Sequence, residues 1–402
     1  MASDPFNSSS STFILVGVPG LEAFPTCLGI LFCSTYVLAV VGNGAVLLVL
    51  ELDKALQAPI HRFLGMLAVI DVVMATSVVP KMLSVFWMDS AEIGYVACFV
   101  QMFLVHSTTA EESGVLLAMA VDRYIAICHP LRYHAILNGR TIAQMGLAIV
   151  LRAVLLMVPL MGLVTSLPYC GSRVVPHSYC EHMAVASLAC ADPWPSSLYS
   201  VAGSSLIVGM DMAFIAVSYG MILKAVLGKE SCWKALSTCG CHLCVVLLFY
   251  IPGIVSIYSQ QFGGAVSERT RVLLADLYLT LPTTLNPLVY SMRTRQIRQA
   301  LIKMLFPGKV CAWCRSLRFS RRVHLCTGSS SCPPRECTGR AGAGSREDSL
   351  ALRKPYSVMR VIWDWEQGHT PGPLSLPPLQ VRRSSKDPPL SSEMFPVPGI
   401  SL

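Results

Sequence analysis

The sequence has few charged residues, and it lacks the short motifs on which most catalytic sites are built. Charged residues make up 13% of its 402 residues, against 53% hydrophobic residues. This balance is too apolar for a soluble globular chain of this length, so the sequence predicts a membrane protein. It contains no H-E-x-x-H, G-x-S-x-G or paired-aspartate motif, so we do not expect an enzyme.

Two further absences narrow the class. The first residues, MASDPFNSSSSTF, have no basic start followed by an apolar core and a cleavage site, so we expect no cleaved signal peptide. The two halves of the chain show no mutual similarity and no matching interrupted apolar segments. This argues against a transporter or a channel, which are commonly built from such repeats.

Long apolar segments are what the sequence does contain. Each is close to the ~20 residues that cross the ~30 Å hydrocarbon layer as a helix. The strict alternation of a transmembrane barrel is absent, so the backbone groups must pair within helices. The sequence therefore predicts an all-α membrane protein, a seven-transmembrane helix bundle, with spans near 26–50, 63–87, 97–121, 141–164, 198–223, 237–258 and 272–292.

Basic residues are unevenly divided between the two sets of loops, and this sets the orientation. With the N-terminus outside, the outer segments hold Arg173, Arg269 and Arg271, whereas the inner segments hold Lys54, Arg62, Arg123, Arg132, Arg140, Lys224, Lys229, Lys234, Arg293, Arg295, Arg298 and Lys303. Cytoplasmic loops carry such an excess. We therefore expect a plasma-membrane protein with an extracellular N-terminus and a cytoplasmic C-terminus. Asn7 would then be an N-glycosylation acceptor.

The chain changes character after the last span. Residues 293–306 carry Ile297, Leu301, Met304 and Leu305 on one helical face and basic residues elsewhere, which predicts a short amphipathic eighth helix on the inner membrane surface. Residues 307–402 are rich in proline and lack any period, so we expect a disordered cytoplasmic tail. The division is 1–25 as extracellular N-terminus, 26–292 as bundle, 293–306 as eighth helix and 307–402 as tail.

The net charge of +8 does not imply a nucleic-acid partner. The tail is basic, and a basic cytoplasmic tail suits an anionic lipid leaflet. Four cysteines fall on the expected oxidising side: Cys98, Cys170, Cys180 and Cys190. They can form two disulfides in three alternative pairings, or one or more can be a buried apolar residue.

Acidic residues inside the spans are costly in hydrocarbon and therefore indicate function. Asp71 and Glu112 lie at similar depth and would repel each other if both were ionised. Either one is a neutral acid hydrogen-bonded to its neighbours, or the two bind a cation. A sodium ion held with Asn286 is one resolution. Asp211 is a further buried acid whose partner the sequence does not identify.

Prolines interrupt the last two predicted spans. Pro252 lies in the sixth span, and Pro282 and Pro287 lie in the seventh. Each removes a backbone hydrogen bond and kinks its helix, and Asn286 can satisfy a freed carbonyl. These spans therefore contain hinges.

The chain resembles an olfactory receptor, of the rhodopsin-like G-protein-coupled class, over about residues 10–306. The residues that carry the resemblance are GN at 42–43, LAVID at 67–71, MAVDRYIAICHPLRY at 119–133, SY at 218–219, KALSTCGCH at 234–242 and NPLVY at 286–290. FILVGVPGLE near the start and HSYCEHM in the long outer loop resemble the class I, or fish-like, branch.

The resemblance implies roles for individual residues. It implies bridges between Cys98 and Cys180 and between Cys170 and Cys190, and it places Asp71 and Glu112 at the family's cation site. It implies a switch that engages the G protein, made of Asp122, Arg123, Tyr219, His242, Tyr250, Asn286, Pro287 and Tyr290.

The resemblance also implies an odorant pocket between the third, fifth and sixth spans. The residues expected to face it are His106, Thr109, Ala110, Gly203, Ile207, Ile254, Tyr258, Gln261 and Tyr278, and each is as plausible as a helix-packing residue. Class I receptors often carry His-Arg before Phe-Gly at the outer end of the sixth span, where this chain has Gln260 and Gln261. Glutamine cannot form a charged bidentate pair with a carboxylate, so we expect a neutral or weakly polar odorant.

The function that follows is an odorant receptor without a catalytic site or an organic cofactor. It would bind a small, mostly apolar odorant in the outer half of the bundle and activate a stimulatory, olfactory-type G protein, which raises cAMP. The alternative is a rhodopsin-like receptor for a non-odorant metabolite in another tissue. The sequence does not distinguish these two, because both would use the same bundle.

Overall fold

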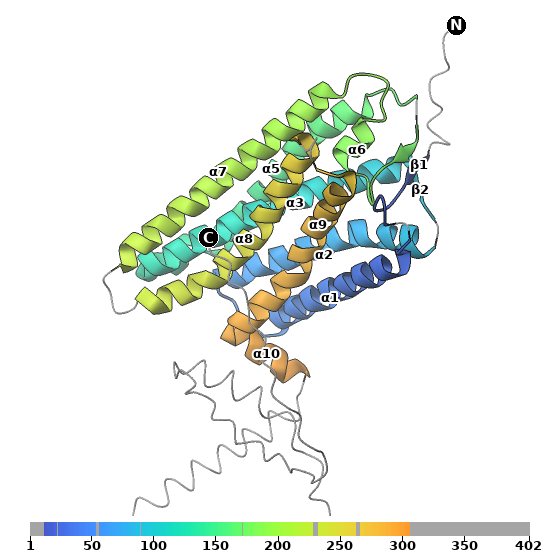
Figure 1. Cartoon of the computed structure of the whole chain (residues 1–402). Helices are drawn as coiled ribbons and strands as arrows, with labels where there is room; N and C mark the ends of the chain where they lie inside the picture. Colours follow the sequence, from blue (N-terminus) through green and yellow to red (C-terminus); the bar gives the residue numbers. More distant parts are fainter. Residues whose placement is uncertain are drawn as a thin grey trace, which may run out of the picture. The chain divides into compact units, whose positions relative to one another are not determined.

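The bundle consists of long helices packed side by side (Figure 1). The computed structural model describes residues 12–21, 23–53, 56–88, 90–170, 172–227, 232–262 and 266–305, without the side chains of some residues near the ends of the helices. The elements are β1 (Thr12–Leu15), α1 (Pro25–Leu52), α2 (Pro59–Trp87), β2 (Glu92–Gly94), α3 (Tyr95–Cys128), η1 (Pro130–Arg132), α4 (Tyr133–Ile136), α5 (Gly139–Thr165), β3 (Val174–Val175), α6 (His182–Ala186), α7 (Trp194–Val226), α8 (Cys232–Phe262), α9 (Glu268–Arg293) and α10 (Arg295–Leu305).

Six of these helices are long and apolar enough to cross a membrane: α1, α2, α5, α7, α8 and α9. The seventh is α3, counted together with the segment Pro130–Ile136, which bends away from it by 115°. All seven predicted spans therefore fall on helices, and the prediction of a seven-helix membrane bundle is confirmed. Asn7 and residues 306–402, with the predicted tail, lie outside the described residues.

The helices begin and end where the sequence gives local reasons to do so. Prolines occupy the first turn of α1, α2 and α7, where a missing N–H costs nothing. The side chain of Asn138 accepts a hydrogen bond from the Thr141 amide at 3.0 Å and caps α5. The hydroxyl of Ser267 caps α9 in the same way through the Thr270 amide at 3.3 Å.

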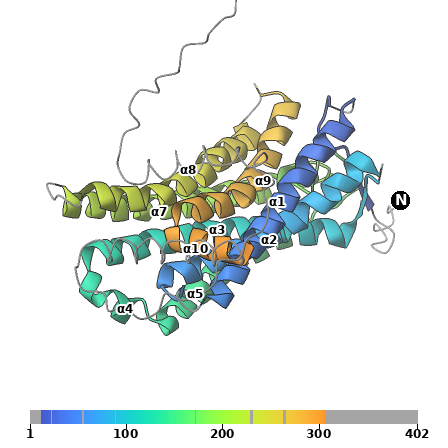
Figure 2. The same cartoon turned by 90° about the horizontal axis from the view of Figure 1, so that it is seen from below.

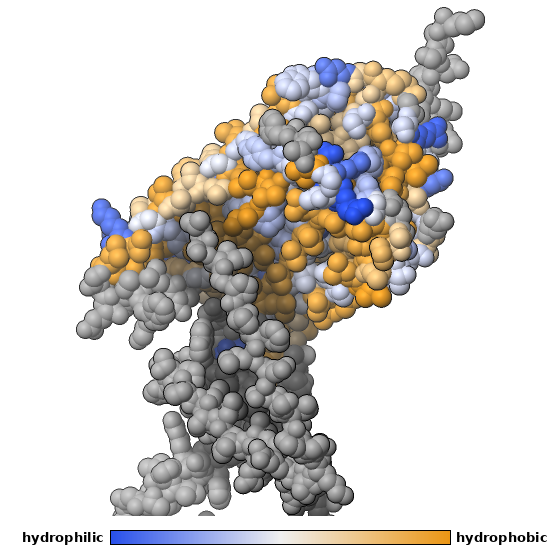
Figure 3. Space-filling view, in the orientation of Figure 1, coloured by the Kyte–Doolittle hydropathy of each residue, from blue (hydrophilic) through white to orange (hydrophobic). Residues whose placement is uncertain are grey.

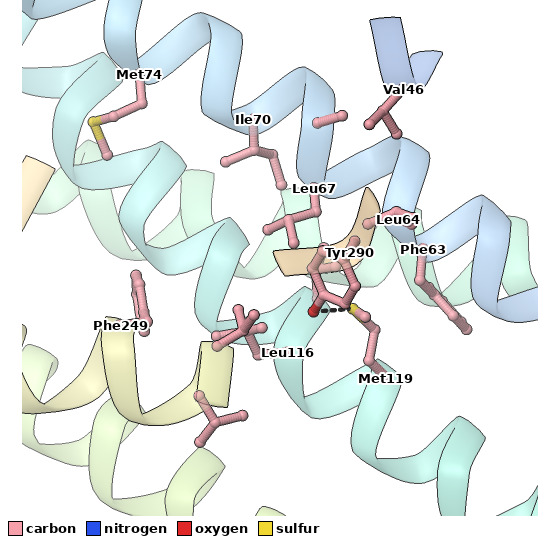
Figure 4. Close-up of a cluster of buried hydrophobic side chains, with 14 of the residues drawn as sticks. Val46, Phe63, Leu64, Leu67, Ile70, Met74, Leu116, Met119, Phe249 and Tyr290 are labelled. Atoms are coloured by element: carbon pink, nitrogen blue, oxygen red, sulfur yellow. Dashed lines mark hydrogen bonds between the residues drawn. The ribbon is translucent and has the colours of Figure 1, made fainter. Parts of the chain in front are cut away.

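Apolar side chains cover both the inside and the outside of the bundle. The inner cluster includes Phe63, Leu67, Leu116 and Met119, which are buried and belong to one cluster of apolar side chains (Figure 4). Large exposed apolar side chains such as Leu38, Leu155 and Phe214 lie on the outer surface, and much of the visible surface is hydrophobic (Figure 3). A helix bundle that is apolar on both sides is the expected solution for a protein surrounded by lipid.

A small three-stranded sheet lies at one end of the bundle, and the sequence did not predict it. β1 is the central strand, antiparallel to β2 with Thr12 opposite Gly94, and parallel to β3 with Ile14 opposite Val174. Each strand has only two to four residues, too few for a recognisable alternation. We call this end of the bundle the sheet end and the opposite end the Arg123 end.

Both disulfides also lie at the sheet end. One joins Cys98, in the first turn of α3, to Cys180, two residues before α6. The other joins Cys170 to Cys190 and closes the segment that contains β3 and α6. These are the two pairs that the resemblance implied. Together with the sheet they hold this segment over the end of α3.

The eighth helix lies at the Arg123 end. α10 contacts α1 and α9, and Figure 2 shows it beside both. Ile297 and Ala300 are buried against the bundle, while Ile302 and Lys303 are exposed. α10 begins at Arg295, two residues later than predicted, because α9 continues through Arg293.

Candidate functional site

A cavity of about 130 Å³ lies between α3, α5, α7, α8 and α9, under α6. Most of its wall is apolar, with Leu160, Ile207 and Phe249 among the lining residues. A cavity of this kind with a few polar groups is the usual form of a small-molecule site. The predicted pocket residues that line it are His106, Thr109, Ala110, Gly203, Ile207, Ile254 and Tyr278.

Two residues predicted to face the cavity, Tyr258 and Gln261, are not among the described residues that line it. Tyr258 is on α8, but 42% of its surface is exposed, and its hydroxyl lies 3.0 Å from that of Ser205. Tyr258 is therefore not among the residues that line the cavity in this structure, and its place in the odorant site stays a prediction. The side chain of Gln261 lies outside the described residues. Its neighbour Gln260 lines the cavity instead.

At the sheet end, the cavity is lined by a cluster of polar side chains that includes two imidazole rings. His182, at the start of α6, is 1% exposed, and its ring packs edge-on against that of His106, with centroids 6.3 Å apart. Burial, with His106 nearby, lowers the pKa of His182 to about 3, so the ring is uncharged at neutral pH. Glu181 accepts a hydrogen bond from the Ala184 amide at 2.7 Å and caps α6. Burial also raises the pKa of Glu181.

The floor of the cavity is part of a charged hydrogen-bond network. Ser113 and Tyr250 line the cavity, with their hydroxyl oxygens 2.8 Å apart. The Ser113 hydroxyl donates to Asp211 Oδ2 at 2.6 Å. Arg152 donates to both oxygens of Asp211, at 2.7 and 2.9 Å, and to the Ala110 carbonyl at 3.0 Å. The network connects α3, α5, α7 and α8, and it supplies the partner of Asp211 that the sequence did not identify.

A second group of acids lies deeper in the bundle, between α2, α3 and α9. The amide nitrogen of Asn286 is 3.2 Å from both oxygens of Asp71 and 3.2 Å from Glu112 Oε1. These three side chains are at most 2% exposed. Asn43 nearby donates instead to the carbonyls of Ala39 and Thr283. The side-chain amide of Asn286 thus donates hydrogen bonds to the carboxyl groups of both Asp71 and Glu112.

This group has the donor set for a hard cation. It offers carboxylate oxygens and the Asn286 amide oxygen, which is buried without a hydrogen-bond partner. Oxygen ligands of this kind suit alkali and alkaline-earth cations. The residues therefore fit a sodium ion, and a shared proton between Asp71 and Glu112 would relieve the same repulsion.

The Arg123 end holds most of the predicted switch residues. Asp122 accepts a hydrogen bond from the Tyr133 hydroxyl at 2.8 Å, while Arg123 Nε is 3.8 Å from its other oxygen. The pairing of Asp122 with Arg123 is thus loose, and the η1–α4 segment supplies the closer contact. Tyr219 Oη and His242 Nδ1 are 2.6 Å apart.

Tyr290 completes this end of the bundle. Its hydroxyl points to the sulfur of Met119 at 3.8 Å (Figure 4). Pro287, one turn earlier in α9, lies against α1 at Gly42, where a Cβ atom would come within 3.0 Å of the proline ring. Gly42 therefore allows α1 to approach the kinked part of α9 closely.

Several residues of the site were missed at the sequence level. Arg152 lies in the middle of an apolar run and could have been flagged by the cost of a charge in hydrocarbon. Ser113 and His182 carried no such signal, because a serine in a helix and a histidine in a loop are common. Their roles depend on neighbours that are distant in sequence, such as Asp211 for Ser113.

Comparisons with known proteins agree on one family. The family profile described as Olfactory receptor matches residues 32–307. Similar human proteins are Olfactory receptor 52I2, 51% identical over 72% of this chain and 84% of the relative, and Olfactory receptor 52I1, 50% identical over 72% and 91%. Olfactory receptor 52D1, also human, is 45% identical over 75% of this chain and 96% of its own length.

A solved structure agrees at the level of the fold. Squid rhodopsin matches with a TM-score of 0.59 and 20% identity, over 72% of this chain and 87% of that one. The rhodopsin-like bundle predicted from the sequence is therefore confirmed.

Proposed function

This chain belongs to the olfactory receptor family, whose members are receptors rather than enzymes, and from that premise we propose what it binds and how it signals. It binds a small, mostly apolar and uncharged odorant in the cavity of about 130 Å³. It then activates a stimulatory, olfactory-type G protein and raises cAMP. The N-terminus is extracellular and the C-terminus cytoplasmic, so the sheet end faces the odorant and the Arg123 end faces the G protein.

This proposal rests on one observation: the side chains at the floor of the cavity are hydrogen-bonded to one another across several helices. Tyr250 and Ser113 both line the cavity, and Ser113 also donates to Asp211. An odorant that presses on Tyr250 acts on α8 two residues before Pro252, where the helix lacks a backbone hydrogen bond. A ligand shifts a two-state equilibrium only through contacts that differ between the states, and this floor is where such contacts arise.

The same helix, α8, connects the cavity to the Arg123 end. α8 carries Tyr250 at the cavity and His242 about two turns away. His242 is hydrogen-bonded to Tyr219 of α7. When α8 swings about Pro252, this contact opens, and Arg123 becomes accessible to the G protein.

Asp71 and Glu112 hold a sodium ion in the resting receptor. The two carboxyl groups and the unpartnered Asn286 oxygen supply the ligands. A bound ion would balance the charge of these residues near Pro282 and Pro287 of α9, and it would thereby favour one arrangement of that helix.

The test is an odorant panel on cells that express the full chain with a cAMP reporter. Arg123→Ala should abolish the cAMP response while surface expression stays within about twofold of the wild type. Arg62→Ala is the matched control, because Arg62 is an exposed arginine in the first turn of α2 at the same end, and it should keep the response. A normal cAMP rise with Arg123→Ala would overturn the switch assignment.

The panel also tests the alternative of a receptor for a non-odorant metabolite. A well-expressed receptor that ignores every odorant but responds to a peptide or a non-volatile amine would favour that alternative. Gln261→Arg sharpens the ligand class further: if carboxylic acids become agonists only in this variant, the wild type discriminates against acids at that position.

A further inference from the structure

The two ends of the cavity differ in how many polar atoms lack a partner. At the sheet end, both ring nitrogens of His182 and the amide nitrogen of Gln260 are buried without a hydrogen-bond partner. Both residues line the cavity, His182 from α6 and Gln260 from the last part of α8. Buried polar groups are normally paired, so these atoms point to a ligand group that pairs with them.

Other polar groups that line the cavity already have partners in the protein. The Thr109 hydroxyl donates to the Val105 carbonyl at 2.8 Å, and the Ser204 hydroxyl donates to the Val201 carbonyl at 3.2 Å. Ser113 and Tyr250 are bonded to each other, and Ser113 also to Asp211. A polar ligand group placed there would compete with existing bonds, whereas a hydrocarbon chain would lose nothing.

The charges at the sheet end select against an anion. No lysine or arginine is among the described residues that line the cavity, whereas Glu181 is. His182, with its pKa lowered to about 3, supplies no positive charge at neutral pH. A carboxylate ligand would therefore lose its hydration without gaining a charge partner. An amine gains little, because the Glu181 carboxylate already accepts a hydrogen bond from the Ala184 amide and lies near the positive charge of Arg271, which does not itself line the cavity.

We propose that the cavity takes a neutral oxygen-bearing odorant whose carbonyl or hydroxyl oxygen accepts hydrogen bonds from Gln260 and His182. The hydrocarbon chain of the odorant points to Tyr250. This inference rests on the proposed function and adds to it the head group, its position and the direction in which the ligand lies. The edge-on contact of His106 with the His182 ring holds that ring in place.

The experiment uses the full chain, a cAMP reporter and five compounds of equal chain length: 2-heptanone, 2-heptanol, heptanoic acid, heptylamine and heptane. We expect the ketone and the alcohol to act at lower concentrations than the other three. Gln260→Leu and His182→Phe should each raise the half-maximal concentration of the ketone by about twofold to tenfold, the loss of one neutral hydrogen bond.

Matched variants separate this role from a loss of folding. Ser259→Ala removes a hydroxyl beside Gln260 that does not line the cavity and donates to its own helix at the Ser256 carbonyl, so the response to the ketone should stay within about twofold. His182→Gln keeps a donor and should restore most of the loss seen in His182→Phe. Gln260→Arg adds a cation at the sheet end and should turn heptanoic acid into an agonist. Surface labelling of each variant controls for expression.

The outcomes are distinguishable from those that test the proposed function. If the receptor responds to odorants but prefers the acid, the amine or the alkane, its assignment as an odorant receptor that raises cAMP stands and this inference is overturned. The same holds if Gln260→Leu and His182→Phe leave the ketone response unchanged at normal expression. A well-expressed receptor that responds to no odorant of any class would overturn both.

Discussion

The two acidic groups inside the bundle differ in how their charge is balanced. Asp211 receives two hydrogen bonds from Arg152 and one from Ser113, so a cation within the protein balances it. Asp71 and Glu112 share the single amide of Asn286, and among the described residues no lysine or arginine is paired with them. The first group is complete in the protein alone, whereas the second requires a proton or an external cation.

This difference suggests a division of roles. A buried ion pair with good geometry holds its helices in one arrangement, and the Arg152–Asp211 pair does so for α5 and α7. A group that must take up a proton or a cation responds to its surroundings. We call Arg152, Asp211 and Ser113 the fixed group, and Asp71, Glu112 and Asn286 the adjustable group. Both contain buried charge, but only the first balances it within the described part of the protein.

The largest expected effect comes from removing the cation of the fixed group. Arg152→Met leaves the Asp211 carboxylate buried and unpaired, which costs about 3–5 kcal/mol. We expect a strong loss of surface expression and of thermal stability in detergent. The double variant Arg152→Met with Asp211→Leu removes both charges and should recover most of that loss. A single variant as stable as the wild type would show that the pair does not fix the helices.

The next effect tests the adjustable group through sodium. Replacing choline chloride by sodium chloride at constant ionic strength should stabilise the wild type, by about 2.7 kcal/mol at a hundredfold excess over the dissociation constant. Asp71→Asn should lose this dependence, because it removes one carboxylate of the pair. Ser113→Ala, which alters only the fixed group, should keep it. Equal sodium responses in wild type and Asp71→Asn would refute the ion site.

A smaller effect tests how tightly Arg152 is held. A Cβ atom on Gly114 would lie 2.9 Å from Arg152 Nη2 and 3.0 Å from the Ile149 side chain. Gly114→Ala should therefore cost about 1–3 kcal/mol, measured as the thermal stability of the purified receptor. Gly209→Ala is the control, because nothing lies within 4 Å of the added atom. A Gly114→Ala variant no less stable than this control would mean that Arg152 can move away freely.

The smallest effect comes from trimming the fixed group by one hydroxyl. Ser113→Ala removes the bonds to Asp211 and to the Tyr250 hydroxyl but leaves both arginine bonds, so the cost should be about 1–2 kcal/mol. Ser204→Ala is the matched control, since the Ser204 hydroxyl donates to the Val201 carbonyl of its own helix at 3.2 Å. Thermal unfolding of the two variants compares them, and equal stabilities would remove Ser113 from the group.

The sequence predicted the elements well because the membrane leaves few alternatives. All seven spans were found from apolar length alone, and helix ends differed mainly where helices extend beyond the hydrocarbon layer, as α3 does by running to Cys128. The paired role of Asp71, Glu112 and Asn286 was also within reach, because buried acids are rare and stand out. The resemblance supplied most of the individual switch and pocket residues.

What the sequence did not predict depends on contacts between distant segments. Nothing local to Asp211 identifies Arg152 as its partner, 59 residues away. The facing direction of Tyr258 depends on the rotation of α8, a helix that contains Pro252. The unpartnered atoms of His182 and Gln260 became visible only once the walls of the cavity were in place.

The central position of β1 has a consequence for the order in which the chain is assembled. β2 and β3 do not pair with each other, because β1 (Thr12–Leu15) lies between them. β1, the first strand to be synthesised, therefore completes its pairing only after β3, the last strand, has been made. Ile14 pairs with Val174, and at 5–20 residues per second the ribosome needs about 8–30 s to make the residues between them. β1 can pair with β2 once residues 92–94 have been made, but its other edge has no partner until β3 follows. Biosynthesis of this receptor therefore leaves one edge of Thr12–Leu15 open until nearly half of the chain has been made.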